Sequence, residues 1–427
     1  MNLDEWLAFI ERQHSRPIDL GLDRIRRVAQ TLGQRQTCPV ILVGGTNGKG
    51  STCAMLERIL LCAGYRVGLY TSPHLLRYNE RVRIDGQPVG DDALCEGFAR
   101  AEAARAKVGD TPLTYFEYGT LCAWEVFAAQ PLDAIILEVG LGGRLDATNL
   151  YEPDVSIVTS VDLDHMDYLG PTREHIGFEK AGIFRAGRPA ICGDIDPPAR
   201  LVDHAHVIDA DLQVLGRDFG FEREDGQWRY WGRSGARSSL AFPALRGAGQ
   251  LGNASCVLAA LDTLRERLPV AMQDIRRGLA EVELAGRFQV LPGRPTVVLD
   301  VAHNPQAARS LADNLGAQLP NAAFHPVTWA VFGMMRDKDI PAVVQALRHR
   351  VDRWLPVTLP GPRAATGDEL AAILRAAGVS GPLDAFASPA AAFAYAREQA
   401  GGDDRILTFG SFLTVAGVLS ALGRPAA

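Results

Sequence analysis

The sequence predicts an α/β protein of two domains, each built on a mostly parallel sheet. Short apolar runs alternate with longer helical patterns along most of its 427 residues, an arrangement typical of parallel sheets. Its composition, 47% hydrophobic and 22% charged, is sufficient for more than one large core. The turn Pro292-Gly-Arg-Pro295 interrupts the alternation, which then starts again. We therefore expect domains at residues 1–290 and 291–427.

Charge and apolar patterning exclude several classes of function. The net charge is −6 and the pI about 5.9, so the chain lacks the broad positive field that attracts duplex nucleic acid or anionic membranes. No apolar run approaches the ~20 residues that span a bilayer, and the start of the sequence shows no targeting pattern. Seven cysteines without a Cys-x-x-Cys pair are typical of reduced thiols. We expect a monomeric, cytoplasmic protein whose partners are small molecules, with no nucleic acid and no membrane.

The stretch Gly44-Gly-Thr-Asn-Gly-Lys-Gly-Ser-Thr52 carries the strongest chemical signal. Two short helical patterns, 7–10 and 22–32, precede it, in a leader of about 40 residues that is too short for an independent domain. An apolar strand at 39–43 then leads into the glycines, and a helix begins near Ser51. Backbone N–H groups, a helix N-terminus and the Lys49 ammonium therefore converge on one point, an arrangement that holds phosphate.

This loop is a variant of the usual phosphate loop, because Val43 stands at the first glycine position and Gly50 directly follows the lysine. A glycine-rich turn can form for steric reasons alone. Here Lys49 and the following hydroxyls favour an ATP triphosphate site. The expected ATP contacts are Thr46, Asn47, Gly48, Lys49, Gly50 and Ser51.

Polar residues follow three further strands, where α/β sheets place their ligands. A strand at 66–70 delivers Ser72, which by itself is more typical of a turn ahead of Pro73. The buried strand 134–137 ends in Glu138, which suits a magnesium ligand better than a salt-bridged edge residue. The strand 155–159 leads into Asp162-Leu-Asp-His-Met-Asp167, either a metal site or a hydrated loop; its place at a strand end favours metal ligation.

Helices and a small antiparallel region complete this domain. Helical patterns are expected at 93–106, from Thr114-Tyr-Phe-Glu117 onward, and at 176–183, 254–264 and 272–280. Lys180 lies in a partly apolar helix, where its ammonium needs a partner; such lysines are usually salt-bridged. Short β-like runs at 207–208, 219–221, 228–231 and 239–242 predict the antiparallel region.

The second domain is predicted to be Rossmann-like. Its strands are expected at 296–300, 329–332, 353–357, 384–387 and 405–409, with helices between them. Asp300 ends the first strand and is followed by Ala-His-Asn-Pro305. Residues 333–339 and 410–414 follow later strands, at positions where a second substrate is bound in such sheets.

Together these motifs resemble one family, the folylpolyglutamate synthases, and within it the bifunctional bacterial dihydrofolate synthase/folylpolyglutamate synthases of the Mur ligase group. The resemblance spans nearly the whole chain and rests on motifs in a fixed order. They are Gly45-Thr-Asn-Gly-Lys-Gly-Ser51, Tyr70-Thr-Ser-Pro-His74, Glu138-Val-Gly-Leu-Gly-Gly-Arg-Leu-Asp-Ala-Thr-Asn149, Asp164-His165, Glu179-Lys-Ala-Gly-Ile183, Gly286-Arg-Phe288, Asp300-Val-Ala-His-Asn-Pro305 and Asp337-Lys-Asp339.

The resemblance implies an ATP-dependent amide ligase. It implies addition of L-glutamate to dihydropteroate, and of further γ-linked glutamates to reduced folates, through an acyl phosphate. It implies an N-terminal P-loop ATPase domain, a C-terminal glutamate ligase domain, and the cofactors ATP and Mg²⁺.

The resemblance also implies roles for individual residues. Lys49, Lys180 and His303 would be catalytic, and Lys180 corresponds to a lysine that is carbamylated in relatives. The metal ligands would be Ser72, Glu138 and His165. Further ATP contacts would be Asn253 at the adenine, Arg287 at the phosphates and Asp300 at the ribose. The folate would contact Arg77, Thr114, Phe116, Asp146, Ala147 and Asn149, with Phe116 stacking on the pterin. His303 and Ser411 would bind glutamate, and Leu413 departs from the histidine often found after Gly-Ser-Phe.

Three alternatives remain at this stage. A Mur-type cell-wall ligase shares the ATPase motifs, but its sizeable N-terminal domain has no counterpart in the short leader. A regulatory P-loop switch shares the first motif, but the sequence has no Asn-Lys-x-Asp element for guanine and adds a second domain that a switch does not need. A folylpolyglutamate synthase without the dihydrofolate synthase step is hardly separated from the bifunctional enzyme by sequence.

Overall fold

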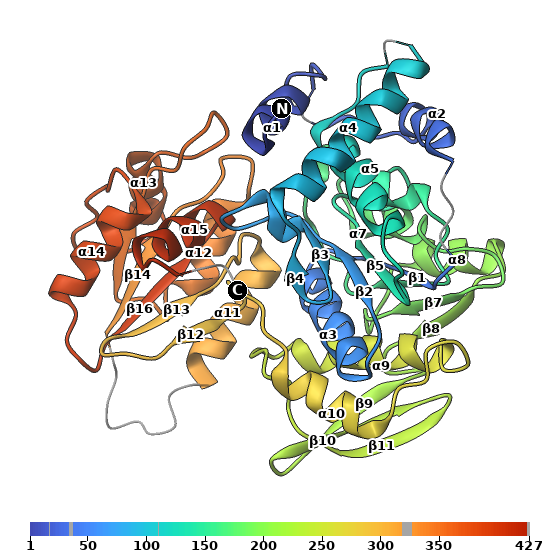
Figure 1. Cartoon of the computed structure of the whole chain (residues 1–427). Helices are drawn as coiled ribbons and strands as arrows, with labels where there is room; N and C mark the ends of the chain where they lie inside the picture. The colour runs from blue at the N-terminus through green and yellow to red at the C-terminus, as the bar shows by residue number, and fades with distance from the viewer. Residues whose placement is uncertain (17, 34–36, 110, 318–326, 425–427) are drawn as a thin grey trace. The chain divides into compact units, whose positions relative to one another are not determined.

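The computed structural model describes residues 1–427 except 17, 34–36, 110, 318–326 and 425–427. It divides into two compact units (Figure 1). Unit 1 comprises residues 1–244 and 251–282, and unit 2 comprises residues 245–250 and 283–427. Among the described residues, no helix has the length and apolar character needed to cross a membrane.

Unit 1 is built on an eight-stranded sheet in the order β4-β3-β2-β5-β1-β6-β7-β8. The six strands from β2 to β8 in this order run parallel, and β3 and β4 form an antiparallel edge. The central strands β1, β5 and β6 are buried along their whole length, because helices cover both faces of a parallel sheet. The strands are β1 Val40–Gly44, β2 Val67–Tyr70, β3 Val82–Ile84, β4 Gln87–Pro88, β5 Ala134–Glu138, β6 Val155–Val158, β7 Pro189–Cys192 and β8 Asp211–Val214.

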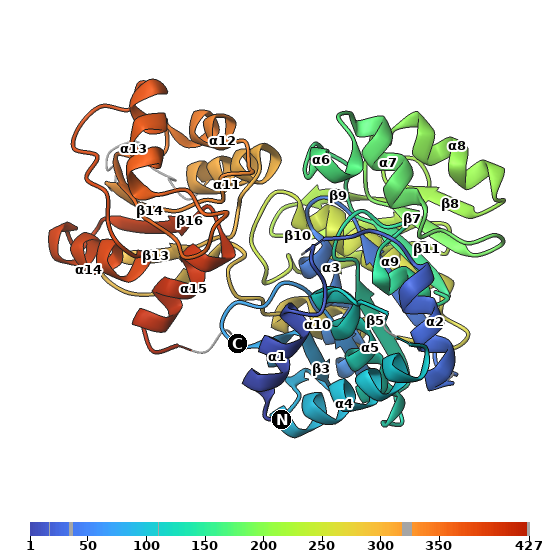
Figure 2. The ribbon, with the colours of Figure 1, turned by 90° about the horizontal axis from the view of Figure 1, so that it is seen from above.

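The helices of this unit pack closely on the sheet and on each other. Gly278 of α10 lies against α3, where a Cβ atom would come within 2.6 Å of the Ile59 Cα, so only glycine permits this approach. Helices α7 and α8 lie side by side (Figure 2). The helices are α1 Leu3–Glu11, α2 Asp23–Leu32, α3 Lys49–Cys62, α4 Asp91–Lys107, α5 Tyr115–Ala128, α6 Met166–Leu169, α7 Arg173–Ala181, α8 Ala199–Val207, α9 Gln250–Thr263 and α10 Met272–Glu281, with the 3₁₀ turns η1 Tyr78–Arg81 and η2 Ala147–Leu150.

A three-stranded antiparallel sheet, in the order β11-β10-β9, completes unit 1. Its strands are β9 Gly220–Glu224, β10 Gln227–Gly232 and β11 Gly235–Leu240. Trp228 and Tyr230 alternate with more exposed residues along β10 and are buried. The Tyr230 hydroxyl lies 3.2 Å from the Asp262 carboxylate, which ties this sheet to α9.

Unit 2 has a five-stranded sheet in the order β12-β13-β16-β14-β15, parallel except for β12. Phe332, Trp354 and Phe409 form an aromatic centre in its core, with ring centroids 4.9 to 5.9 Å apart. The strands are β12 Gln289–Leu291, β13 Thr296–Leu299, β14 Thr328–Phe332, β15 Arg353–Pro356 and β16 Arg405–Phe409. The helices are α11 Pro305–Ala317, α12 Ile340–Leu347, α13 Gly367–Ala376, α14 Pro389–Gln399 and α15 Phe412–Ala421.

The predicted fold class is confirmed, but two predicted strands are wrong. Residues 207–208 are not a strand, because Val207 ends α8, whose apolar side is formed by the buried Leu201 and Ala205. Residues 384–387 form only an isolated bridge. The Phe386 amide donates to the Pro356 carbonyl at the end of β15, and the Phe386 carbonyl accepts from the Thr358 amide. Short strands at or next to the sheet edges, β3, β4, β7, β8 and β12, were not predicted. The predicted domain boundary after residue 290 stays a prediction.

Candidate active site

The carboxyl ends of four neighbouring parallel strands bring the polar motifs of unit 1 to one edge of the sheet. The register pairs Val43 of β1 with Glu138 of β5, Gly44 with Val158 of β6, and Tyr70 of β2 with Leu137. The segments that follow these strands therefore start side by side. They are the phosphate loop at 45–48, Ser72 and its neighbours, the glycine-rich stretch from Glu138, and the loop at 159–165.

Two glycines set the shape of the phosphate loop. Gly45 and Gly48 have φ angles of +142° and +91°, which side-chain-bearing residues rarely adopt. A Cβ at Gly45 would overlap the Thr159 side chain, and one at Gly48 would lie 2.5 Å from Asn253 Oδ1. The loop is thus packed against the end of β6 and against α9.

Lys49 is the first residue of α3, and its ammonium lies over the loop. Lys49 Nζ donates to the carbonyl oxygens of Gly45, at 2.9 Å, and Thr46, at 3.2 Å. Ser51 and Thr52 follow in the first turn and are buried. The positive charge therefore stands at the N-terminus of a 14-residue helix, where the helix dipole also favours an anion.

Glu138 and Ser72 are adjacent, and both offer oxygen ligands. The Ser72 amide donates to Glu138 Oε2 at 3.1 Å, and Glu138 is only 4% exposed. The Glu138 and Lys49 charges both act on the Cys53 thiol in the first turn of α3, which places the carboxylate near the phosphate loop. Hard oxygen donors beside a phosphate site fit a magnesium ion.

The loop at 162–167 stays a predicted metal site through His165, and two of its acids bond to its own backbone. No group of three or more His, Cys, Asp or Glu side chains able to hold a metal exists within the part of the chain that the structure describes. The acids instead cap their own loop: Asp162 Oδ1 accepts from the Leu163 amide at 2.8 Å, and Asp164 Oδ1 from the His165 amide at 2.9 Å. These bonds hold His165 in a left-handed conformation with φ of +50°, at the start of α6.

Lys180 is buried in α7, with only 3% of its surface exposed. Burial, reinforced by the Lys49 charge, lowers the pKa of Lys180 to about 7, while Asp164 and Asp146 partly oppose this effect. Near pH 7 the neutral amine is therefore much more populated than in an exposed lysine. A neutral amine is the form that reacts with carbon dioxide to give a carbamate, so the lysine expected to carry this modification is in the appropriate state.

Most polar groups expected to contact folate are engaged within the protein. Asp146 caps η2, accepting from the amides of Leu141 at 2.8 Å and Thr148 at 3.0 Å. Thr114 forms a reciprocal capping box with Glu117 at the start of α5. Asn149 Nδ2 donates to the backbone carbonyls of Arg144 and Gly182, and Ala147 is buried. Arg77 differs, because it is exposed and pairs with Asp91 at 3.1 Å. These contacts show how the 140–149 loop is held in place.

Phe116 presents a stacked aromatic face in the same region. Its ring lies 5.9 Å from that of Tyr70, at an interplanar angle of 30°. It also covers Gly140, where a Cβ atom would approach a ring carbon to 2.6 Å. Gly140 is therefore required for the glycine-rich loop to pass beneath the ring.

A second polar cluster lies at the carboxyl edge of the sheet in unit 2. Asp300 follows β13 and accepts from the amides of Ala302, at 2.7 Å, and Phe288, at 2.8 Å. Burial raises its pKa, although the Arg287 charge and these bonds oppose the effect. The Arg287 guanidinium lies 5.2 Å from the centre of the Phe412 ring, and the His303 ring lies 6.3 Å from it.

Ser411 belongs to the same cluster. It follows β16, is 6% exposed, and caps α15 by accepting from the Leu413 amide at 3.2 Å. The structure thus brings Arg287, Asp300, His303 and Ser411 together in unit 2, as it brings the phosphate loop and the Ser72–Glu138 pair to one edge of the sheet in unit 1.

Comparison with known proteins decides the family. The family models of the Mur ligase middle domain and the Mur ligase glutamate ligase domain match residues 43–197 and 286–412. The dihydrofolate synthase/folylpolyglutamate synthase of Escherichia coli (strain K12) is 45% identical over 421 residues, which covers 98% of this chain and 95% of the relative. The chain belongs to the dihydrofolate synthase/folylpolyglutamate synthase family.

Solved structures of the same family superpose over the whole chain. E. coli FolC in complex with DHPP and ADP has a TM-score of 0.92 at 44% identity, covering 99% of this chain and 98% of that one. A bifunctional folylpolyglutamate synthase/dihydrofolate synthase with Mn, AMPPNP and L-glutamate bound has a TM-score of 0.90 at 43% identity, with the same coverage.

Beyond the family motifs, sequence reasoning missed the residues that hold the site loops. Thr159 and Ser160 hydrogen-bond to the phosphate loop, and Arg173 and Asp194 hold the loop that carries them. Only Asp194 had a recognisable signal, since it is an acid just after a short apolar run. The pairing of Arg173 with Asp194 has no local signature.

Proposed function

We propose that this chain is an ATP-dependent acid–amino acid ligase that joins L-glutamate to dihydropteroate, forming dihydrofolate, and then adds γ-linked glutamates to reduced folates. Membership of the family supports both activities. The observation that carries the chemistry is the convergence of Lys49, the phosphate loop and the Ser72–Glu138 pair at one edge of the sheet.

The chemistry requires activation of a carboxylate, which is a poor electrophile. One oxygen of the acceptor's carboxylate attacks the γ-phosphorus of ATP, the bond to the β-phosphate oxygen breaks, and ADP leaves. The glutamate amine then attacks the acyl phosphate carbon, loses a proton and expels phosphate, which leaves an amide. Lys49 and the loop amides from Gly48 to Ser51 stabilise the charge on the transferring phosphoryl group, since fixed cations and N–H donors are the main source of such stabilisation.

Ser72, Glu138 and His165 would hold Mg²⁺ in this proposal. The ion neutralises phosphate charge when it is bound. A carbamate would convert the buried Lys180 amine into an anion able to bind a cation. This modification would give the buried position in α7 a function.

The remaining residues divide between nucleotide, folate and glutamate. Asn253 would contact adenine, Arg287 the phosphates and Asp300 the ribose. His303 and Ser411 would bind glutamate, with His303 acting at the acyl phosphate. The folate would be held by Arg77, Thr114, Phe116, Asp146, Ala147 and Asn149. Residues 1–290 would form the ATP-binding domain and residues 291–427 the glutamate ligase domain.

We further propose that the enzyme works as a monomer in the cytoplasm, with small-molecule substrates and no nucleic acid partner. The net charge of −6 and the absence of Cys-x-x-Cys pairs from the sequence support this proposal.

The test is ATP-dependent incorporation of labelled L-glutamate by the purified protein, run in parallel with dihydropteroate and tetrahydrofolate as acceptors. Product with both acceptors is expected. Product with tetrahydrofolate alone would reduce the proposal to a folylpolyglutamate synthase, and product with neither, despite ATP binding, would refute it.

A further inference from the structure

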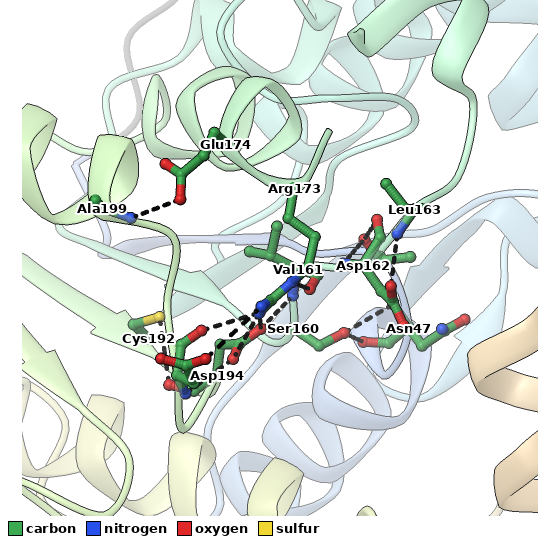
Figure 3. Close-up of polar contacts among 12 residues, drawn as sticks. Asn47, Ser160, Val161, Asp162, Leu163, Arg173, Glu174, Cys192, Asp194 and Ala199 are labelled. Atoms are coloured by element: carbon green, nitrogen blue, oxygen red, sulfur yellow. Dashed lines mark hydrogen bonds and ion pairs between the residues drawn. The ribbon is translucent and has the colours of Figure 1, made fainter. Parts of the chain in front are cut away.

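Two charged side chains hold both backbone polar groups of one residue, Val161, in the loop at 159–165 (Figure 3). Asp194 Oδ2 accepts from the Val161 amide at 2.8 Å, and Arg173 Nε donates to the Val161 carbonyl at 2.9 Å. The two side chains also pair with each other, with Arg173 Nη2 lying 3.1 Å from Asp194 Oδ2. Both polar groups of this buried residue are thus fixed by one ion pair, which we call the Arg173–Asp194 clamp.

The clamp draws together three elements that are distant in sequence. Arg173 is the first residue of α7, Asp194 follows β7, and Val161 follows β6. A further bond from Arg173 Nη2 to the Asp196 carbonyl, at 2.9 Å, and one from the Asp196 amide to Asp194 Oδ1, at 3.1 Å, stiffen the arrangement.

The residues on either side of Val161 bind the phosphate loop. The Thr46 amide donates to the Ser160 carbonyl at 2.8 Å, and the Asn47 amide to Ser160 Oγ at 3.1 Å. Thr46 Oγ1 bonds the Asp162 backbone twice, donating to its carbonyl at 3.1 Å and accepting from its amide at 3.0 Å. The clamped residue, Val161, therefore lies between the two residues that hold Thr46 and Asn47 in place.

We propose that Arg173 and Asp194 are positioning residues for phosphoryl transfer. By fixing the backbone on both sides of the Val161 Cα, the clamp keeps Ser160 and Asp162 against the phosphate loop and presents His165, four residues further on. The inference rests on the proposed ATP and magnesium site, and it assigns a role in that site to two side chains that do not themselves contact the nucleotide.

Arginine suits this role because of its shape. Its planar guanidinium donates in two directions at once, from Nε to a carbonyl and from Nη2 to a carboxylate. Lysine at 173 reaches one of these acceptors at a time, and methionine reaches neither while keeping much of the apolar stem. A graded effect, with Arg173→Met more severe than Arg173→Lys, is therefore expected.

The chain offers a matched control in the Arg233–Asp218 pair. Arg233 Nη2 lies 3.0 Å from Asp218 Oδ1, and Asp218 Oδ2 accepts from the Val214 amide at 2.9 Å. The arginine side chains of the two pairs are 39% and 46% exposed and the aspartates 12% and 18%, so Arg233→Met removes a similar ion pair away from the phosphate loop.

The test measures the dissociation constant of ADP by calorimetry with and without Mg²⁺, together with kcat, KM and the Mg²⁺ concentration for half-maximal activity. For Arg173→Met we expect kcat to fall and the Mg²⁺ requirement to rise by about 10- to 100-fold, as for residues that orient ligands without touching the substrate. ADP binding in the presence of Mg²⁺ should weaken, and the KM for dihydropteroate should change less than about two-fold. Arg173→Lys should recover part of each loss.

A lowered melting temperature with unchanged ADP affinity, Mg²⁺ requirement and kcat in the folded variant would show a merely structural clamp and overturn the inference. An equal loss in Arg233→Met would overturn it too. If the unsubstituted protein binds Mg²⁺ and ADP but ligates no glutamate, the proposed reaction is refuted. The role of the clamp is then decided by ADP binding with and without Mg²⁺: weaker binding in Arg173→Met supports it, and unchanged binding overturns it.

Discussion

Replacing Lys180 with methionine should stabilise unit 1, and more strongly at low pH than at high pH. The lysine is buried in α7 and its pKa is lowered from 10.5 to about 7. At about 1.36 kcal/mol per pH unit, this difference corresponds to a cost of about 5 kcal/mol for keeping the ammonium in the folded protein. Methionine has a similar length, carries no charge and removes that cost.

The direction with pH follows from proton binding. Below about pH 7 the amine is protonated in both the folded and the unfolded chain, so the full cost is present. Between about pH 7 and 10.5 the unfolded chain binds more protons, and folding becomes more favourable as the pH rises. The gain in unfolding free energy from Lys180→Met should therefore shrink by about 3 kcal/mol between pH 6 and pH 9.

Hydrogen exchange of the amides in β1 and β5 measures this effect within unit 1, because these buried strands exchange only on extensive opening. Variant and parent are compared at the same pH, without nucleotide or bicarbonate, so that intrinsic exchange rates cancel. Lys107→Met, at an exposed position of α4, is the matched control and should show no such trend. A gain for Lys180→Met that is equal at pH 6 and pH 9 would refute the lowered pKa. Bicarbonate at pH 9 should stabilise the parent but not the variant, if the neutral amine forms a carbamate.

Other predictions concern the phosphate loop, the folate region and the metal. Lys49→Ala should remove ATP-dependent glutamate addition, with a fall in kcat of at least about 10²–10³-fold and an unchanged circular dichroism spectrum; unaltered activity would contradict the phosphate-site assignment. Gly48→Ala should cost about 1–3 kcal/mol, because φ is +91° and the new Cβ meets Asn253, and calorimetry should show weaker ADP binding. Thr114→Ala should destabilise the start of α5 by about 1 kcal/mol through loss of the cap, seen as faster amide exchange at Glu117, whereas a silent change would rule out that role. Chelation with EDTA should abolish activity, and added Mg²⁺ should restore it.

Much of the fold could be predicted because its signals are local. The buried strands β1 and β5 are mainly continuous apolar runs, and the capping box at Thr114 and Glu117 marks the start of α5. The missed strands are only two to four residues long and lie at or next to a sheet edge, so each offers little sequence in which a pattern can emerge. Val207 misled the prediction because an exposed β-branched residue at a helix end resembles the start of a strand.

The sequence by itself determined which residue types follow each strand, and with them the kind of chemistry. The sequence predicts a phosphate site from Lys49 beside glycines, and a metal ligand from Glu138 at the end of an apolar strand. Both predictions are possible because each signal lies within a few residues. Only the tertiary structure decided which of these strand ends are neighbours. The order β2-β5-β1-β6 differs from chain order, so hydrogen bonding between strands distant in sequence places Ser72 beside Glu138.

The same reason explains the Arg173–Asp194 clamp and the state of Lys180. The sequence shows no pattern for an ion pair between residues 21 positions apart, or for a residue whose backbone is held from two other elements, since each depends on how the elements pack. The lowered pKa of Lys180 likewise arises from burial and from the charge of Lys49, 131 positions away in the numbering, rather than from residues next to it in the chain.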